Sequence, residues 1–484
     1  MIRKLVFIIS FNFIVIIIIS SCRQTDNNHL KEYVYAWDPA FRYEIIDTLY
    51  AETWKEYYIK MVSGTWLTEK EVNHTEWWHW VTIVVPNNVL ETEALLFIGG
   101  GSSKDMKPKK ATELLVNAAL ETKSIIAEIS NIPFQPLNYM DDSKDDRYED
   151  DLIAYGWNKF LESGAKDNDV EWLARLPMTR AVVRGMDIIQ KVTNDINIKI
   201  DEFVVAGASK RGWTTWTTAI VDNRVIAIVP IVIDLLNVIP SFDHHWRCYG
   251  EWSPAIDDYV NEGITEWMGS EEYNRLLELV EPFSFTDQLS IPKFLINATG
   301  DEFFVTDSWK FYWDKLIGSK YLQYVPNGSH GLTGTYNPGS LIAFYNAIIT
   351  NSKIPEFNWH VSNDSIYLEI NTIYNYTVKS WEAINKDTRD FRVPVIGRSW
   401  KSHKINKTLN HKYFLHVNQP KTGYKAGLLE ITIDSGNYPF VFTTGTLVSP
   451  NTYPFMPFKP SNPKGKRIKS VSYTHLTLPT ICSV

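Results

Sequence analysis

Residues 203–213 read FVVAGASKRGW, and this stretch decides the predicted fold class. It opens with a short apolar run that contains two valines, which is typical of a buried strand. A turn of small residues follows, and a helix is expected after it. Such a turn lifts a serine hydroxyl out of the sheet and aims the helix N-terminus at the reacting centre. The stretch therefore predicts Ser209 as a nucleophile.

The spacing of the glycines around this serine is unusual. Gly207 lies two residues before it, where the turn brings the backbone close to the strand. The common pattern is G-x-S-x-G, but Arg211 occupies the second glycine position and Gly212 comes one residue later. On its own, G-x-S-x-x-G is a weaker signal than the common pattern. The alternative is an ordinary strand-to-helix turn with Ser209 as the helix cap.

A nucleophilic serine needs a base within hydrogen-bond reach, and the base needs an orienting acid. The acid candidate is Asp301, in INATGDEFFV, where a buried strand ends at a Gly-Asp turn. The base candidate is His330, in VPNGSHG, a loop after the next strand. Three strand-end residues in the order Ser, Asp, His together predict a catalytic triad.

Two other carboxyl groups remain candidates for the acid of the triad. Asp234 follows the strand after the serine turn, which is an alternative position for the triad acid. Alternatively, Asp234 caps a helix or forms an ion pair. Glu302, next to Asp301, is a weaker option.

An oxyanion hole needs two backbone N–H donors aimed at the developing negative charge. The first is expected from Lys210, directly after the serine. The second is expected from Gly99 and Gly100, in a run of three glycines after an apolar strand, because glycine lets the backbone approach closely. A plain flexible turn is the alternative.

Several charged side chains are candidates for substrate contact. Arg211 is expected to bind a substrate carboxylate through two hydrogen bonds, or else to form a structural ion pair. His244 and His245 are expected to contact substrate or to pack against their surroundings. Adjacent histidines point in different directions and no third ligand is indicated, so we predict no metal site and no cofactor. Residues 141–151 hold seven acidic residues among eleven and are expected to form a solvated loop, although Glu149 to Asp151 could engage a cationic group.

Strands and helices alternate over the middle of the chain, which is the signature of a mostly parallel sheet. The expected strands are 76–86, 94–98, 124–129, 203–208, 225–233, 293–298 and 320–325. Residues 23 to about 70 show no clear pattern and are expected to wrap the surface. From about 357 onward the pattern has period two, as in SIYLEI at residues 365–370, and convincing helices are absent.

These patterns divide the chain into four parts. Residues 23–354 are expected to form an α/β domain with a cap inserted at about 235–282, a long aromatic segment between two core strands. Residues 355–460 are expected to form a small antiparallel β-sandwich. Residues 461–484 form a tail whose end, YTHLTLPTICSV, resembles translated sequencing adapter, so His475 and Cys482 receive no role.

The first 22 residues have the features of a lipoprotein signal peptide. Arg3 and Lys4 precede an apolar run over residues 5–19, and Ser20-Ser21-Cys22 follows. We expect Cys22 to be lipidated and to anchor the protein to a membrane in the bacterial cell envelope, as an outer-membrane lipoprotein or in the periplasm. An ordinary signal peptide or a single anchor helix is the alternative.

Composition excludes several classes of function. The chain has 484 residues, 44% hydrophobic and 21% charged, which suits a large folded core. Its net charge of −8 offers no support for nucleic-acid binding. With only three cysteines, one of them Cys22, the chain has no disulfide framework.

The chain resembles the PhoPQ-activated pathogenicity-related protein family. The resemblance rests on GASKRGWTTW at 207–216, VPIVIDLLN at 229–237 and NATGDEFF at 297–304, with support from RLPMT at 175–179 and EDDLIAY at 149–155. It implies an α/β-hydrolase fold, a surface or secreted location, and a link to resistance against cationic host peptides. The G-x-S-x-x-G turn is also similar to that of glucuronoyl esterases.

The expected function is that of a serine hydrolase. Ser209 would attack a carbonyl group of a peptide or ester substrate, with His330 as the base and Asp301 as the orienting acid. The alternative is a non-catalytic protein on an α/β-hydrolase scaffold, which binds a peptide or a glycan.

Overall fold

The structure is a computed structural model that describes residues 29–468. The predicted signal peptide with Cys22, and the end of the predicted tail at 469–484, lie outside the described residues. Within residues 29–468, no helix is long and apolar enough to cross a membrane.

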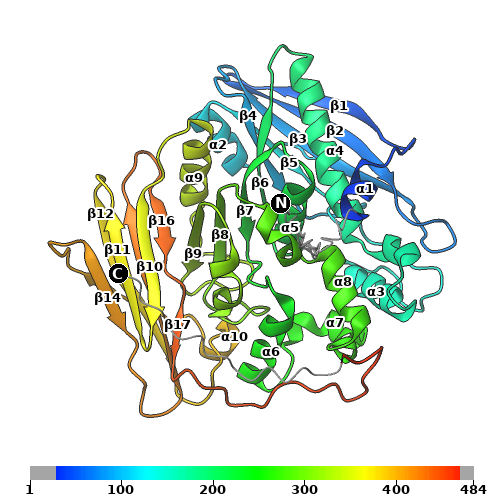
Figure 1. Ribbon diagram of the computed structural model, residues 1–484. Helices are drawn as coiled ribbons and strands as arrows, with labels where there is room; N and C mark the ends of the chain where they lie inside the picture. The colour runs from blue at the N-terminus through cyan, green and yellow to red at the C-terminus, as the bar shows by residue number, and fades with distance from the viewer. Residues whose placement is uncertain (1–28, 469–484) are drawn as a thin grey trace, which may run out of the picture.

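A nine-stranded sheet forms the centre of the molecule, in the order β1-β2-β3-β5-β4-β6-β7-β8-β9 (Figure 1). Its strands are β1 (Arg42–Tyr50), β2 (Trp54–Thr65), β3 (Glu76–Pro86), β4 (Glu93–Ile98), β5 (Ile125–Ile129), β6 (Glu202–Ala208), β7 (Val225–Ile231), β8 (Lys293–Ala298) and β9 (Lys320–Val325). From β5 to β9 neighbouring strands are parallel, whereas β3 is antiparallel to both β2 and β5. The predicted α/β class with a mostly parallel sheet is confirmed.

Helices cover both faces of this sheet, because its central strands are apolar on both faces. In β6, Phe203 and Val205 belong to one core, and Val204 and Ala206 belong to the other. The helices of the first core include α1 (His29–Tyr35), α3 (Glu149–Glu162), α4 (Arg175–Asn194) and α5 (Lys210–Val221). Those of the second are α2 (Glu113–Thr122) and α9 (Gly339–Ile349).

The expectation for residues 23–70 was wrong. Within this range, α1 packs near α4, and β1 and β2 extend the sheet by two strands. The strand pattern of β2 is hidden because a charged residue, Glu56, is buried in it. The Glu56 carboxylate accepts hydrogen bonds from Trp54 Nε1 at 2.8 Å and from the Ala111 amide at 2.7 Å.

The segment between β7 and β8 is helical, where the sequence predicts a cap. It contains α6 (Val238–Tyr249), α7 (Asp257–Asn261) and α8 (Glu271–Val280). The described end of the chain runs along these helices (Figure 1): the Glu271 amide donates to the Lys466 carbonyl, and the Lys464 amide donates to the Glu266 carbonyl, both at 2.9 Å. The role of the segment as a cap stays a prediction.

The C-terminal part is antiparallel, as predicted. One sheet has the order β10 (Glu356–Ser362), β11 (Ser365–Asn371), β14 (Lys412–His416). The other has β13 (Lys401–Ile405), β12 (Tyr376–Asn385), β15 (Tyr424–Ile433) and β16 (Phe440–Thr443), with β17 (Leu447–Ser449) also paired to β15; a short helix, α10 (Val393–Ile396), precedes β13. Leu368 of the first sheet and Ile431 of the second share one core. The boundary of this part as a separate domain stays a prediction.

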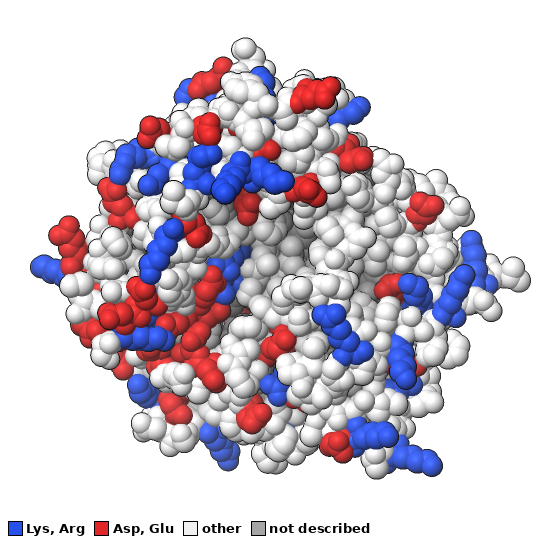
Figure 2. Space-filling view, turned by 180° about the vertical axis from the view of Figure 1, so that it is seen from behind, with Lys and Arg blue, Asp and Glu red and all other residues white. Residues whose placement is uncertain are grey.

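Acidic side chains gather over α3 and α7 on one face of the molecule (Figure 2). Residues 141–151 contribute to this surface, but they are not a simple solvated loop as expected. The buried Arg147 guanidinium forms ion pairs with Asp142 at 2.5 Å, with Asp151 at 2.6 Å and with Glu262 at 2.8 Å. The acidic segment is therefore folded around one buried cation.

A second buried ion cluster joins the helical segment to the C-terminal part. The Asp307 carboxylate, in the loop after β8, forms an ion pair with Arg389 Nη2 at 2.7 Å and a hydrogen bond with His244 Nε2 of α6 at 2.8 Å. Arg389 follows β12, is 1% exposed, and also donates to Cys248 Sγ at 2.8 Å. These contacts hold α6 in position next to the carboxyl ends of the strands.

Replacing Arg389 tests this cluster. We expect Arg389→Met to lower the free energy of unfolding by about 3 kcal/mol, because the buried Asp307 carboxylate loses its strongest partner. Thermal unfolding followed by circular dichroism measures the change. Arg42→Met, which breaks an exposed pair with Glu76, is the control and should leave the melting temperature almost unchanged. An equal change in the two variants would contradict the account.

Candidate active site

The carboxyl ends of three parallel strands bring the predicted triad together. Ser209 directly follows β6, Asp301 follows β8 and His330 follows β9. His330 Nε2 lies 2.9 Å from Ser209 Oγ, and His330 Nδ1 lies 2.9 Å from Asp301 Oδ2. The arrangement has the nucleophile, base and orienting acid in mutual hydrogen-bond contact, which is what proton transfer from a serine hydroxyl requires.

The backbone of Ser209 is strained. Its φ is 58° and its ψ is −125°, a conformation that non-glycine residues rarely adopt. The turn is pinned from one side by the Ser209 amide, which donates to the Ile231 carbonyl of β7 at 2.7 Å. This backbone conformation directs the side chain away from the sheet and toward His330.

Close packing requires glycine at the two positions around the serine. A Cβ on Gly207 would lie 2.7 Å from the Arg211 carbonyl oxygen, and one on Gly212 would lie 2.9 Å from Ile233 Cγ2 and 3.0 Å from the Gly207 carbonyl oxygen. The first turn of α5 therefore packs on the strand at position 212. This explains why the chain has G-x-S-x-x-G and can hold an arginine at position 211.

The imidazole of His330 is partly buried between the nucleophile and the acid. Burial favours the neutral ring, but the Asp301 carboxylate next to Nδ1 favours the charged ring more strongly, so the pKa of His330 is raised above its usual 6.5. The Phe303 ring packs against the imidazole, with centroids 4.2 Å apart. These contacts fix the ring orientation in which Nε2 faces Ser209.

Asp234, the alternative acid, has other partners. Its carboxylate accepts hydrogen bonds from the Tyr312 hydroxyl at 2.5 Å and from the Tyr324 hydroxyl. Complete burial, only partly offset by these two hydrogen bonds, raises the pKa of Asp234 to about 7. It makes no hydrogen bond to His330 in the described structure. Glu302 accepts from the His330 backbone amide at 2.7 Å and does not contact the ring nitrogens by a hydrogen bond.

The three predicted oxyanion donors differ in whether their backbone amides are already hydrogen-bonded. Lys210 is the first residue of α5, so its N–H has no acceptor within the helix. The Gly100 N–H has no acceptor among residues 29–468. The Gly99 N–H, however, donates to the Ile129 carbonyl of β5 at 2.7 Å. The prediction that Gly99 donates to the oxyanion is therefore wrong, because its amide already donates to the neighbouring strand.

For Arg211 the sequence leaves open a substrate carboxylate or a structural ion pair, and the structure shows the ion pair. Nε donates to the Ile132 carbonyl and Nη2 to Glu149 Oε1, both at 2.5 Å. A Cβ on Gly100 would lie 3.0 Å from Nη2, so the guanidinium packs directly on the glycine loop. Arg211 braces the loop that carries Gly100.

Glu149 and Asp150, at the start of α3, engage the cations next to the nucleophile. Lys210 Nζ lies 2.9 Å from Glu149 Oε2 and 2.8 Å from Asp150 Oδ2. Although burial opposes ionisation, Arg211 and Lys210 hold the pKa of Glu149 at about 2. The sequence offers binding of a cationic group as an alternative to a solvated loop; the cationic groups that Glu149 and Asp150 engage are the chain's own Lys210 and Arg211.

His244 and His245 are buried within the protein rather than placed at the serine. His244 contacts Asp307 through Nε2 and the Tyr453 hydroxyl through Nδ1, each at 2.8 Å. His245 Nε2 accepts from the Ser253 amide at 3.0 Å. Burial lowers the pKa of His244 to about 4 and that of His245 to about 3, so both rings are neutral near pH 7. Neither lines the pocket at Ser209; the substrate-binding role predicted for them is corrected to packing.

A pocket opens beside Ser209 and is mostly apolar. Its apolar lining consists of Trp157, Trp213, Ile233, Leu235, Val238, Phe242, Ile256, Phe303 and Phe304. Asp150, Lys210, Tyr259 and Arg175 are the polar side chains in its wall. Sequence reasoning missed Arg175 and Tyr259 in this wall, because they come from α4 and α7, far from the serine turn in the chain.

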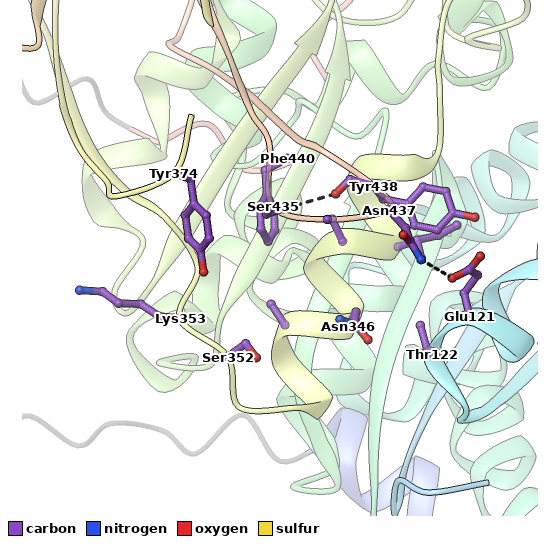
Figure 3. Close-up of a pocket in the computed structure, with 14 residues that line it drawn as sticks. Glu121, Thr122, Asn346, Ser352, Lys353, Tyr374, Ser435, Asn437, Tyr438 and Phe440 are labelled. Atoms are coloured by element: carbon purple, nitrogen blue, oxygen red, sulfur yellow. Dashed lines mark hydrogen bonds between the residues drawn. The ribbon is translucent and has the colours of Figure 1, made fainter. Parts of the chain in front are cut away.

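A second hollow lies between α2, α9 and loops of the C-terminal sheets (Figure 3). Its wall is polar and includes Asn346, Lys353, Tyr374 and Asn437, and Asn437 Nδ2 donates to Glu121 Oε2 at 2.8 Å. None of the predicted site residues lines it. In the described part of the chain, no group of three or more His, Cys, Asp or Glu side chains is placed to hold a metal ion.

Comparison with known proteins identifies the family. The model of the PhoPQ-activated pathogenicity-related protein family matches residues 30–392. The chain belongs to this family. Autocrine proliferation repressor protein A of Dictyostelium discoideum is 35% identical over 472 residues, which cover 91% of this chain and 94% of that protein. The similarity between these two chains therefore extends over almost their whole length.

Solved structures resemble this PhoPQ-related chain only distantly. An acetyl xylan esterase from Paenibacillus sp. R4 is 13% identical, with a TM-score of 0.46, and the match covers 68% of this chain and 93% of that one. A glucuronoyl esterase from Solibacter usitatus is 11% identical, with a TM-score of 0.39, over 66% and 91% of the two chains.

The raised pKa of His330 can be measured directly. In an NMR titration of the protein labelled with ¹³C-histidine, we expect His330 to lose its proton above pH 6.5, and Asp301→Asn to lower that pKa because the neighbouring negative charge is gone. Asp234→Asn, a buried carboxyl group without a hydrogen bond to the ring, is the matched control and should shift the pKa less. If Asp234→Asn lowers the pKa as much as Asp301→Asn, the assignment of the acid is wrong.

Proposed function

We propose that this protein is a serine hydrolase that cleaves an ester by acyl transfer to Ser209. The observation that carries the proposal is the continuous contact from Ser209 Oγ through the His330 ring to the Asp301 carboxylate, with distances of 2.9 Å on each side. A strained serine at the start of a helix supports it further, since this is how an exposed nucleophile is held.

The proposed reaction has two balanced steps. Ser209 Oγ attacks the carbonyl carbon while His330 Nε2 takes the hydroxyl proton; the alcohol leaves with that proton, and an acyl-serine remains. Water then attacks the acyl-serine, giving its proton to His330, which returns it to Ser209 Oγ as the acid leaves. The amides of Lys210 and Gly100 are proposed to hold the oxyanion in both steps.

An ester suits the pocket better than a polypeptide. The pocket is enclosed by bulky side chains such as Trp157, Trp213 and Phe242, which leave room for a small group rather than for an extended chain. A peptide substrate was the other expectation, and the same triad would cleave it. The location in the bacterial envelope and the link to cationic host peptides stay predictions.

Turnover of a simple ester tests the proposal. We expect the full chain to hydrolyse 4-nitrophenyl acetate, and Ser209→Ala to lower kcat/KM by at least about 1000-fold, since no other group takes over the nucleophile. Ser352→Ala, in the wall of the second hollow, is the control and should retain activity. Unchanged hydrolysis by Ser209→Ala would contradict the proposal.

A further inference from the structure

One buried cation in the pocket lacks a carboxylate partner. Arg175, the first residue of α4, is 3% exposed and lines the same pocket as Ser209. No carboxylate of residues 29–468 lies within 4.0 Å of its guanidinium, whereas buried Arg147 pairs with three carboxylates and buried Arg180 with one. A guanidinium taken out of water without a counter-ion is costly.

The hydrogen bonds of Arg175 are also incomplete. Nη1 donates to the carbonyl of Lys210, the residue after the nucleophile, at 2.9 Å. The Nε atom is buried and has no hydrogen-bond partner. The guanidinium lies over the Trp213 ring, 4.7 Å from its centroid, so the aromatic face supplies part of the missing stabilisation. Arg175 is thus a residue of the pocket wall whose guanidinium keeps one unpaired donor, the buried Nε.

The neighbouring acidic groups are already engaged. Glu149 pairs with Lys210 and Arg211, and Asp150 pairs with Lys210 and accepts from the Tyr259 hydroxyl at 2.9 Å. Burial lowers the pKa of Arg175, and the charge of Asp150 and the neighbouring Tyr259 hydroxyl, which also hydrogen-bonds the guanidinium, offset this effect only in part. Residues 29–468 therefore supply no full counter-ion for this side chain.

The geometry points to a substrate with an apolar body and one carboxylate, which Arg175 binds while Ser209 attacks the ester. This inference rests on the proposed function and names its substrate class. The carboxylate stays unchanged through the reaction and only positions the ester. Arginine suits the task because its planar fork matches the geometry of a carboxylate.

Binding to an inactive variant tests the inference without turnover. The probes are monomethyl glutarate, with the carboxylate in the acyl part, and 4-acetoxybenzoate, with the carboxylate in the alcohol part. Methyl pentanoate and 4-methylphenyl acetate are their neutral matches. In the full chain with Ser209→Ala, quenching of fluorescence from the tryptophans in the pocket wall reports the dissociation constants. We expect at least one anionic probe to bind about 10- to 100-fold more tightly than its neutral match, the range of a charge-assisted hydrogen bond.

Variants of Arg175 identify the source of the preference. In the Ser209→Ala chain, Arg175→Met should abolish the difference between anionic and neutral probes, and Arg175→Lys should keep part of it. Arg184→Met, on the same helix but paired with Asp187, is the matched control and should keep the difference. Circular dichroism checks folding. If Arg175→Met does not fold, the comparison of the probes and the Arg175→Lys variant still show whether Arg175 causes the preference for anionic probes.

The outcomes separate this inference from the proposed function. Equal binding of anionic and neutral probes, or a preference that survives Arg175→Met, would overturn the inference even if the enzyme hydrolyses esters. Conversely, a protein without hydrolysis can still show the Arg175-dependent preference, and then only the proposed reaction fails.

Discussion

The strained backbone at Ser209 is the constraint on which the rest of the site depends. A positive φ at a serine persists only where its surroundings hold it, and here a hydrogen bond to β7 and the close packing of α5 on β6 do so. Because both strands lie in the middle of a parallel sheet with helices on each face, the turn cannot relax without disturbing both cores. The same sheet delivers Asp301 and His330 to the serine, since all three follow parallel strands.

A network of charges surrounds this turn and gives each part of the site its place. Lys210 and Arg211, the two residues after the nucleophile, both pair with the first turn of α3, and Arg211 packs on the glycine loop. Arg175 reaches the carbonyl of Lys210 from α4. Three elements distant in sequence are thus tied to one turn, so a shift in any of them would move the proposed oxyanion donors.

The sequence predicted those features that local pattern determines. Each triad residue follows an apolar run, which predicts that Ser209, Asp301 and His330 lie at the carboxyl ends of strands. The structure brings the three side chains together. The sequence failed where long-range contacts decide. Buried Glu56 hid the strand β2, the amide of Gly99 was lost to a neighbouring strand, and the role of Arg211 depends on Glu149, 62 residues earlier in the chain. His244 and His245, which the pattern offers as substrate contacts, are buried, and Asp307, Tyr453 and Ser253 occupy three of their four ring nitrogens.

Covalent labelling of the nucleophile tests the central claim most directly. The full chain is treated with a fluorophosphonate, digested, and mapped by mass spectrometry. The account predicts one adduct per chain, on Ser209, formed faster as the pH rises through the pKa of His330, because only the neutral imidazole can accept the hydroxyl proton. A folded protein that acquires no adduct on Ser209, or that reacts instead at another residue, would contradict it.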